Sequence, residues 1–243
     1  MKYYYDLHVH SCLSPCGDND STPNSIAGIA SLSGLNIVAL TDHNTTKNCA
    51  AFFDAASRYG IVPVAGMELT TSEDIHVVCL FETPEDASLF DKCLDKYRIP
   101  IKNKASVFGE QLIMDSYDNV IGEVEDLLIN ATGVSIEDVT SLVENFGGVC
   151  YPAHIDRTSN SITAVLGGIP KEYRFDFHEF HDANLVDELS EKYGINNKKV
   201  IISSDAHYLT DIRDGENFFD LDADGTSPED VRKKLFELLR GKS

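Results

Sequence analysis

The stretch YYYDLHVHSC (residues 3–12) joins an aromatic, strand-like run to two histidines two positions apart. Residues i and i+2 of a β-strand point to the same side, so His8 and His10 can both bind one ion at the end of this strand. A histidine near a strand end is more often an ordinary hydrogen-bonded residue. The rest of the chain decides between these two interpretations.

Strand-like and helix-like segments alternate along most of the chain. Several strand segments are short apolar runs, which is typical of strands covered on both faces. Helix starts are marked by Thr22-Pro23, Thr83-Pro84, Ser135 and Ser227-Pro228. This alternation predicts an α/β fold with a parallel sheet, closed into a barrel or left as an open doubly wound sheet. The predicted strands are residues 3–8, 37–41, 61–67, 75–81, 149–153, 175–180 and 200–203.

The length of 243 residues is compatible with one α/β domain, so we expect residues 1–243 to form a single domain. Residues 99–132 break the alternation, because a strand-like part there is mixed with acidic turns. We therefore predict that residues 99–132 are an insertion between two barrel units.

Composition narrows the class of protein. Forty acidic and 20 basic residues give a net charge of −20, which repels phosphate backbones, so nucleic acid is expected to be an unlikely partner. No apolar run reaches the roughly 18 residues of a membrane span. The start MKYYYDL lacks the basic segment and the following apolar segment of a secretory signal. This predicts a cytoplasmic protein in which the six cysteines are reduced.

The histidines and carboxylates fall at the ends of the predicted strands. The carboxyl ends of the strands of an α/β barrel converge on one face, where catalytic sites are built, so these side chains are expected to meet in one pocket. Imidazole nitrogens mixed with carboxylate oxygens suit zinc, manganese or iron, and the lack of thiolates favours an open catalytic site. The residues concerned are His8, His10, Asp42, His43, Glu68, His154, Asp205 and His207.

An ordered series of motifs resembles the PHP family, named for polymerase and histidinol phosphatase. The series runs over nearly the whole chain: DLHVHS (6–11), TDHN (41–44), GMEL (66–69), His76, PAH (152–154) and SDAH (204–207). The resemblance implies a metal-dependent phosphoesterase on a distorted seven-stranded (β/α) barrel of the TIM type. It also implies a cluster of two or three divalent metal ions, zinc, manganese or iron.

The resemblance also implies how the ions are shared. Glu68 would bridge the first and second ions. Asp18 is preferred over Asp20 at the third, because it keeps the spacing to Thr22-Pro23. The implied ligands are His8, His10, Glu68 and Asp205 for the first ion, Glu68, His76 and His154 for the second, and Asp18, His43 and His207 for the third.

Some residues are expected to have catalytic or substrate-binding roles in addition to, or instead of, metal binding. Catalytic roles are expected for Glu68, Asp42 and His207. His207, Asp42 or a water on the third ion would assist the leaving group, or Asp42 would instead orient a ligand. Arg157 and His178 are expected to contact the substrate. In DFHEFHD (176–182), Glu179 matches an acidic position of the family, and His181 is expected at the surface.

The function that follows is hydrolysis of small phosphomonoesters by a hydroxide bridging two metal ions. The same metals could cut phosphodiesters, so a nuclease or nucleotide phosphodiesterase is the alternative. A non-catalytic metal-binding module is a third interpretation, disfavoured because the ligand series is complete.

Overall fold

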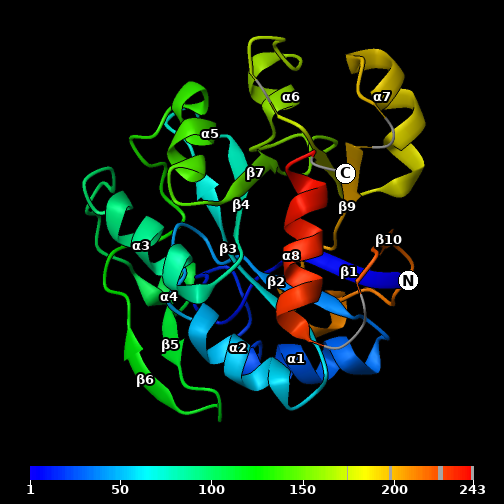
Figure 1. Cartoon of the computed structure of the whole chain (residues 1–243). Helices are drawn as coiled ribbons and strands as arrows, with labels where there is room; N and C mark the ends of the chain where they lie inside the picture. Colours follow the sequence, from blue (N-terminus) through cyan, green and yellow to red (C-terminus); the bar gives the residue numbers. More distant parts are fainter. Residues whose placement is uncertain (174, 197–198, 224–226, 242–243) are drawn as a thin grey trace.

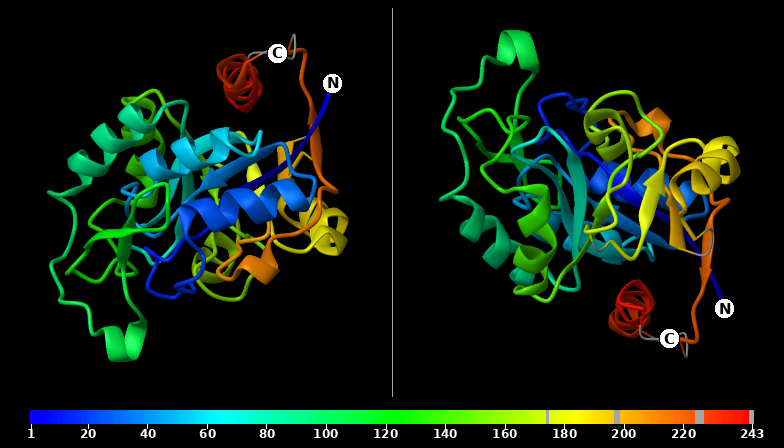
Figure 2. Two further views of the ribbon diagram at one scale, coloured as in Figure 1. Left: turned by 90° about the horizontal axis from the view of Figure 1, so that it is seen from below. Right: turned by 90° about the horizontal axis from the view of Figure 1, so that it is seen from above.

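The computed structural model describes residues 1–173, 175–196, 199–223 and 227–241. Its main sheet has six strands in the order β10-β1-β2-β3-β4-β7 and curls around one side of the molecule (Figures 1 and 2). Two further pairs, β5-β6 and β8-β9, lie outside that sheet. The strands are β1 (Lys2–Val9), β2 (Ile37–Leu40), β3 (Val62–Thr70), β4 (His76–Phe81), β5 (Leu112–Met114), β6 (Val120–Glu123), β7 (Val149–Pro152), β8 (His178–Phe180), β9 (Val200–Ile202) and β10 (Phe218–Asp220).

The first half of the sheet is parallel, as predicted. β1 pairs with β2 and β2 with β3 in parallel. The crossovers contain helices α1 (Pro23–Leu32) and α2 (Cys49–Ser57). The Thr22 hydroxyl caps α1 by accepting a hydrogen bond from the Ser25 amide, and Pro23 occupies the first turn.

The prediction of a wholly parallel sheet is wrong at β4. β3 and β4 are antiparallel, with Thr70 opposite His76, and β4 is also antiparallel to β7. The reason is the length of the connection: residues 71–75 are too few for a crossover helix, so the chain turns back as a hairpin. This turn brings the first residue of β4 to the edge of the sheet where β3 ends.

A closed seven-stranded barrel is not observed among the described strands. β8 and β9 form a parallel pair separate from the main sheet. Single hydrogen bonds link the pair and its following loop to their neighbours: the Ile155 amide donates to the Glu179 carbonyl, and the His10 amide donates to the Ala206 carbonyl. The described chain is therefore a mixed α/β domain built on a curled, partly open sheet.

Helices cover both faces of the sheet. One apolar cluster joins the sheet to α1, α2, α3 (Pro84–Leu94) and α5 (Ile136–Glu144). A second cluster joins the opposite face to α8 (Pro228–Leu239), which crosses in front of the sheet in Figure 1. The predicted starts of α1, α3, α5 and α8 are confirmed, since each has a Ser or Thr side chain accepting a cap hydrogen bond. Shorter elements are α4 (Ala105–Phe108), α6 (Ile162–Leu166), α7 (Val186–Tyr193), η1 (Ala183–Leu185) and η3 (Leu209–Asp211).

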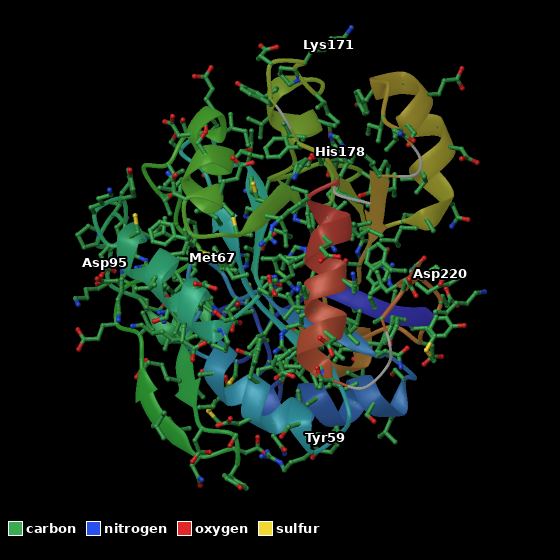
Figure 3. The ribbon with its side chains drawn as sticks, in the orientation of Figure 1. Tyr59, Met67, Asp95, Lys171, His178 and Asp220 are labelled. Carbon is green, nitrogen blue, oxygen red and sulfur yellow. The ribbon has the colours of Figure 1, made fainter. Side chains whose placement is uncertain are left out.

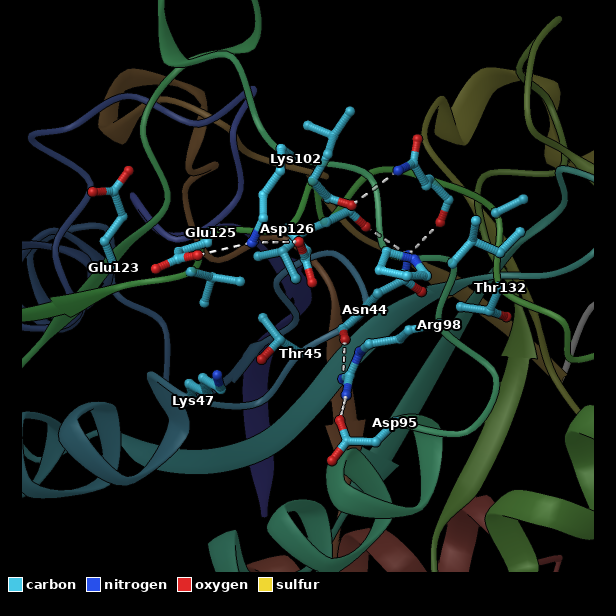
Figure 4. A pocket seen from close by; sticks show the side chains of 17 residues that line it. Asn44, Thr45, Lys47, Asp95, Arg98, Lys102, Glu123, Glu125, Asp126 and Thr132 are labelled. Carbon is cyan, nitrogen blue, oxygen red and sulfur yellow. Dashed lines mark hydrogen bonds and ion pairs between the residues drawn. The ribbon is translucent and has the colours of Figure 1, made fainter.

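Residues 99–132 contain α4 and the β5-β6 hairpin, at the edge of the molecule in Figure 1. Asn44 ties this segment to the sheet, because its side-chain amide donates to the carbonyls of Leu128 and Asn130. A cavity of about 380 Å³ lies between the two parts (Figure 4). In the described part of the chain, no helix is both long and apolar enough to cross a membrane. The insertion and the cytoplasmic location remain predictions.

Candidate metal centre

The strands bring eight histidine, glutamate and aspartate side chains to one edge of the sheet. His76 joins this set although it begins a strand, because β4 runs antiparallel to β3. Three overlapping ligand groups result, and within each group the ligand atoms lie within 4.8 Å of one another. The groups are His8, His10, Glu68 and Asp205; His43, Glu68 and His76; and His10, His43 and His207.

The loops at this edge hold unusual backbone conformations. His154, Asp205 and Asn44 have φ values of 28°, 52° and 51°, in the left-handed region that non-glycine residues seldom adopt. Strained residues of this kind gather at functional sites, where the surrounding structure enforces them. Two of the three, His154 and Asp205, belong to the predicted ligand set.

Glu68 lies at the middle of the centre and is almost fully buried. Its Oε1 atom is 2.7 Å from Nδ1 of His76 and 3.1 Å from Nε2 of His154. Its Oε2 atom is 3.0 Å from Nδ1 of His43 and 3.4 Å from Nε2 of His10. The two oxygens thus face different histidines, and Glu68 belongs to two of the three ligand groups.

The predicted first ligand set comes together as a group. Oδ1 of Asp205 lies 3.3 Å from Nε2 of both His8 and His10. The two Nε2 atoms are themselves 3.1 Å apart. Four ligand atoms at these distances can surround one ion.

The other two sets differ from the prediction. His43 and His10 take part in groups where His154 and Asp18 were expected. His154 remains next to Glu68, but Asp18 does not contribute its carboxylate to any group among the described residues. Asp18 Oδ1 accepts a hydrogen bond from the Asp20 amide instead, and Asp20 is exposed.

Hydrogen bonds behind the ligands fix the imidazole tautomers. Nδ1 of His8 lies 2.8 Å from Oε2 of Glu179, a carboxylate that can only accept, so Nδ1 carries the proton and the Nε2 lone pair faces the centre. Nδ1 of His207 lies 2.9 Å from the Asp205 carbonyl, which has the same consequence. Glu179 also accepts from the His154 amide, so this carboxylate supports two neighbouring ligands.

Asp42 supports His10 rather than facing the cavity. Its carboxylate accepts hydrogen bonds from the Ser11 amide, the Ser11 hydroxyl and the Ser14 hydroxyl. The Ser14 oxygen is in turn 2.9 Å from Nδ1 of His10, so it accepts the proton of that nitrogen. Of the two roles expected for Asp42, this position matches the orientation of a ligand.

The charges of the centre are strongly coupled. Burial lowers the pKa of His10, but the neighbouring carboxylates of Asp205 and Glu68 outweigh burial and raise that pKa to about 9. Burial raises the pKa of Glu68, but the histidines around it hold the pKa well below its usual range. Burial lowers the pKa of His43 to about 3 and that of His207 to about 4, so both are neutral at pH 7. Neutral imidazoles and ionised carboxylates are the forms that bind metal ions.

The buried ligand atoms fit divalent ions. Nδ1 of His43 and His76, Oε2 of Glu68 and Oδ1 of Asp205 are buried and have no hydrogen-bond partner in the described structure. Buried polar atoms are normally satisfied, and ions supplied at these positions would satisfy all four. The donors are nitrogen and oxygen, which zinc, manganese and iron accept.

The residues expected to contact substrate separate into two groups. Arg157 lines a cavity of about 120 Å³ together with His43, Glu68 and His76, and its Nη1 lies 3.0 Å from Oδ2 of Asp205. His178 begins β8 and so lies at the end of that strand away from the centre (Figure 3). Glu179 faces His8, so the alternation of the strand turns His178 to the opposite side.

His181 is not the plain surface residue that was expected. It directly follows β8 and lies half-buried between Arg157 and Arg213. Arg213 and Ser14 were not singled out in the sequence. Ser14 lies four residues after His10, and Arg213 six residues after His207, and this closeness to the ligand motifs was the only signal.

A model of the family described as "PHP domain" matches residues 6–150, more than half of the 243 residues. The 5'-3' exoribonuclease of Haemophilus influenzae is 35% identical over 83 residues, which is 33% of this chain and 29% of that protein. The amidohydrolase of Chromobacterium violaceum, solved with bound sulfate, is 18% identical with a TM-score of 0.58, covering 89% of this chain and 91% of that one.

The lesion-specific endonuclease PfuEndoQ from Pyrococcus furiosus also has a similar structure, with a TM-score of 0.64 and 18% identity. A complex of Endonuclease Q with a 27-mer duplex gives a TM-score of 0.67 and 18% identity. Each of these two similarities covers 100% of this chain and 57% of the other, so this chain spans little more than half of the endonuclease.

These structures correct the expectation that nucleic acid is an unlikely partner. Endonuclease Q carries a duplex substrate with an abasic lesion at its active site, on a fold similar to this one. A net charge of −20 describes the whole surface and not the field at one site, so it does not exclude nucleic acid. The family match over residues 6–150 shows that this chain belongs to the PHP-domain family.

Proposed function

We propose that the chain hydrolyses phosphate esters with two or three divalent ions held at the metal centre, and that small phosphomonoesters are its first candidate substrates. The observation that carries the proposal is the set of three overlapping ligand groups, joined by shared residues Glu68, His10 and His43. Adjacent ions with a common carboxylate ligand are typical of sites that displace one oxygen of a phosphate by another.

Bound divalent ions lower the pKa of a coordinated water and offset the charge of phosphoryl oxygens. The chain supplies the positioning. Glu179 and the Asp42–Ser14 pair orient His8 and His10. The residues that would hold the ions are His8, His10, His43, His76, His154, Glu68, Asp205 and His207. Arg157 lines the cavity, so its guanidinium can donate to an oxygen of the bound phosphate.

Two observations bear on the substrate. The cavity of about 120 Å³ is smaller than the roughly 300–1,000 Å³ of most ligand pockets, which favours entry of a phosphate group alone. The second candidate function, cleavage of phosphodiesters in nucleic acid, is supported by the similarity to Endonuclease Q and to the exoribonuclease. Under either function, the phosphate enters the cavity and the rest of the substrate lies outside it.

The contacts at the ends of the strands also support a finer proposal for the fold. We infer that β1, β2, β3, β4, β7, β8 and β9 make up a distorted seven-stranded barrel. The hydrogen bonds from Ile155 to Glu179 and from His10 to Ala206 support it, because they lie at the two gaps between the main sheet and the β8-β9 pair.

A substrate panel with added manganese tests the function. It contains p-nitrophenyl phosphate, phosphorylated metabolites, nucleoside monophosphates, single-stranded DNA and RNA, and a duplex with an abasic site. We expect manganese-dependent release of phosphate from monoesters by the native chain, and loss of that activity in Glu68→Gln and His8→Ala. If the chain cleaves nucleic acid in preference to monoesters, phosphodiester cleavage replaces monoester hydrolysis as the proposed function. Activity that survives both substitutions would contradict the proposed centre.

A further inference from the structure

His43 differs from His8 and His10 in how its ring is held. It belongs to two of the three ligand groups, and its Nδ1 atom lies 3.0 Å from Oε2 of Glu68. Supporting hydrogen bonds orient the rings of His8 and His10, whereas Nδ1 of His43 has no hydrogen-bond partner among the described residues. The position of the His43 imidazole therefore depends on how the loop after β2 is fixed.

Asn44, the next residue, ties this loop to β3. Its φ value of 51° lies in the left-handed region, which the surrounding contacts must select. The Asn44 amide donates a hydrogen bond to the Glu68 carbonyl at 2.9 Å, and Asn44 Oδ1 accepts one from the Thr70 amide at 2.9 Å. These contacts hold one side of the loop.

Asp91 of α3 holds the residues that follow Asn44. Its side chain is buried, and its Oδ2 atom accepts three hydrogen bonds from the loop. The donors are the Thr45 hydroxyl at 2.9 Å, the Thr46 amide at 2.7 Å and the Thr46 hydroxyl at 3.1 Å. One carboxylate oxygen therefore fixes the backbone and the side chains of residues 45–46.

Arg98 connects Asp91 to Asn44. Its Nη2 atom donates to the Asn44 carbonyl at 2.6 Å and forms an ion pair with Oδ1 of Asp91, and its Nη1 atom donates to the Asp91 carbonyl at 3.0 Å. Figure 4 shows Arg98 between Asn44 and the exposed Asp95. A buried carboxylate is costly without a partner charge, so Arg98 both neutralises Asp91 and holds the residue that follows His43.

We propose that Asp91 and Arg98 are positioning residues of the metal centre, which act through the backbone of Asn44 and residues 45–46 to hold the His43 imidazole toward the ions. The inference rests on the proposed phosphoesterase function and extends its machinery to α3 and the segment after it. Neither Asp91 nor Arg98 belongs to a ligand group, so their effect on the ions is indirect.

The way in which the groups share ligands makes this role selective. His43 belongs to the groups that contain His76 and His207, but not to the group of His8, His10, Glu68 and Asp205. Loss of Asp91 or Arg98 should therefore weaken the ions that depend on His43 and spare one ion. A general loss of structure would weaken every ion.

The test is calorimetric titration of the metal-free chain with manganese, which gives a Kd for each ion. The variants are Asp91→Asn, Arg98→Gln and Arg98→Lys. Asp95→Asn is the matched control, because it removes a carboxylate from the same guanidinium on the solvent side, where 72% of the Asp95 side chain is exposed. Exposed ion pairs of this kind contribute little.

We expect Asp91→Asn and Arg98→Gln to weaken at least one ion by about tenfold, the lower end of the usual effect of supporting contacts, while one ion keeps its native Kd. Arg98→Lys should restore part of the loss, because it keeps the charge but not the planar fork. Asp95→Asn should bind every ion as the native chain does.

Hydrogen exchange in the metal-free chain gives a second readout. The Thr46 amide donates to Asp91 and the Asn44 amide donates to Glu68, so both amides should exchange faster in Asp91→Asn. Amides of α8, on the opposite face of the sheet, should keep their native rates. Faster exchange in the loop alone would show that the effect is local.

Native Kd values for every ion in Asp91→Asn and Arg98→Gln would overturn the proposal, and so would an equal weakening of every ion. Native exchange rates at Asn44 and Thr46 in Asp91→Asn would overturn it as well. Fewer than two ions per native chain would instead contradict the proposed centre of two or three ions. Hydrogen exchange would then still decide whether Asp91 holds the loop.

Discussion

At the residue scale, the centre depends on side chains that stand behind the ligands. Glu179 fixes the tautomer of His8, and the Asp42–Ser14 pair fixes that of His10. Such supporting residues hold a ligand nitrogen in place and keep its lone pair directed at the ion. The two histidines of residues 3–12 can therefore act as ligands only because these supporting side chains orient their rings.

Glu179→Gln tests this support. The amide keeps the size of the side chain but removes the charge next to the buried His8, so we expect manganese affinity to fall by about 10–100-fold. Isothermal titration calorimetry, in which manganese is added to the metal-free protein, measures this affinity. Glu172→Gln, which removes an exposed charge, is the control and should bind as the native chain does. An unchanged affinity in Glu179→Gln would contradict the role.

The coupled charges predict a pH dependence of metal binding. His10 has a pKa of about 9, so below that pH the metal-free centre holds a proton that an ion must displace. Apparent manganese affinity should rise by about tenfold per pH unit for each displaced proton between pH 6.5 and 8.5. Calorimetry in two buffers of different ionisation enthalpy should detect proton release. A constant affinity without proton release would contradict the protonated state.

At this scale the sequence predicted the ligands better than their grouping. Histidines and carboxylates at strand ends identified seven of the eight side chains that meet at the sheet edge, because the fold brings such ends together. The eighth, His76, begins a strand and was named only from the family resemblance. The division into groups depends on side-chain directions in the loops, where His154 and Asp205 have positive φ values that no spacing reveals. Arg213 was not foreseen, since a single arginine after the last motif has no pattern of its own.

At the scale of elements, the β3–β4 hairpin matters most, because the side chains of Glu68 on β3 and His76 on β4 are in contact. Gly66 lies in β3 two residues before Glu68. A Cβ atom at Gly66 would lie 2.7 Å from the carbonyl oxygen of Cys79 and 2.9 Å from Leu80 Cδ2. The close approach of the two strands therefore requires glycine at this position.

Gly66→Ala should push β3 away from its neighbours and displace Glu68. We expect a loss of about 1–3 kcal/mol in the free energy of unfolding, the usual cost of overpacking, together with weaker manganese binding. Urea denaturation and calorimetry measure the two effects. Gly168→Ala is the matched control, because a Cβ there meets nothing within 4 Å. Equal behaviour of the two variants would contradict the packing argument.

Elements with local signals could be predicted, and elements without them could not. The helices beginning at Pro23, Pro84, Ile136 and Pro228 follow capping residues that the sequence displays. Helix α2 begins after Asn48, which makes no side-chain cap hydrogen bond, and it was not predicted. The strand-helix alternation did not predict the direction of β4, because alternation implies parallel strands, whereas the short loop at 71–75 forces an antiparallel hairpin.

At the scale of the whole molecule, metal ions should stabilise the fold. The ligand groups join β1, β3, β4 and the loops after β1, β2 and β9, so bound ions would cross-link segments distant in sequence. Manganese at about 100 times its Kd adds about 2.7 kcal/mol per site. At about 2–4 °C per kcal/mol, the Tm should rise by several degrees, and EDTA should reverse the rise. A Tm that manganese does not change would contradict the cross-linking role.

The measurement that tests the central claim most directly is the number of metal ions bound per chain. The native protein and the Glu68→Gln variant are loaded with manganese or zinc and freed of unbound metal. Their metal content is then measured by inductively coupled plasma mass spectrometry. Three overlapping groups, two of which contain Glu68, predict about two or three ions per native chain and a clear loss in Glu68→Gln. Fewer than one ion per native chain, or an unchanged number in Glu68→Gln, would contradict the account.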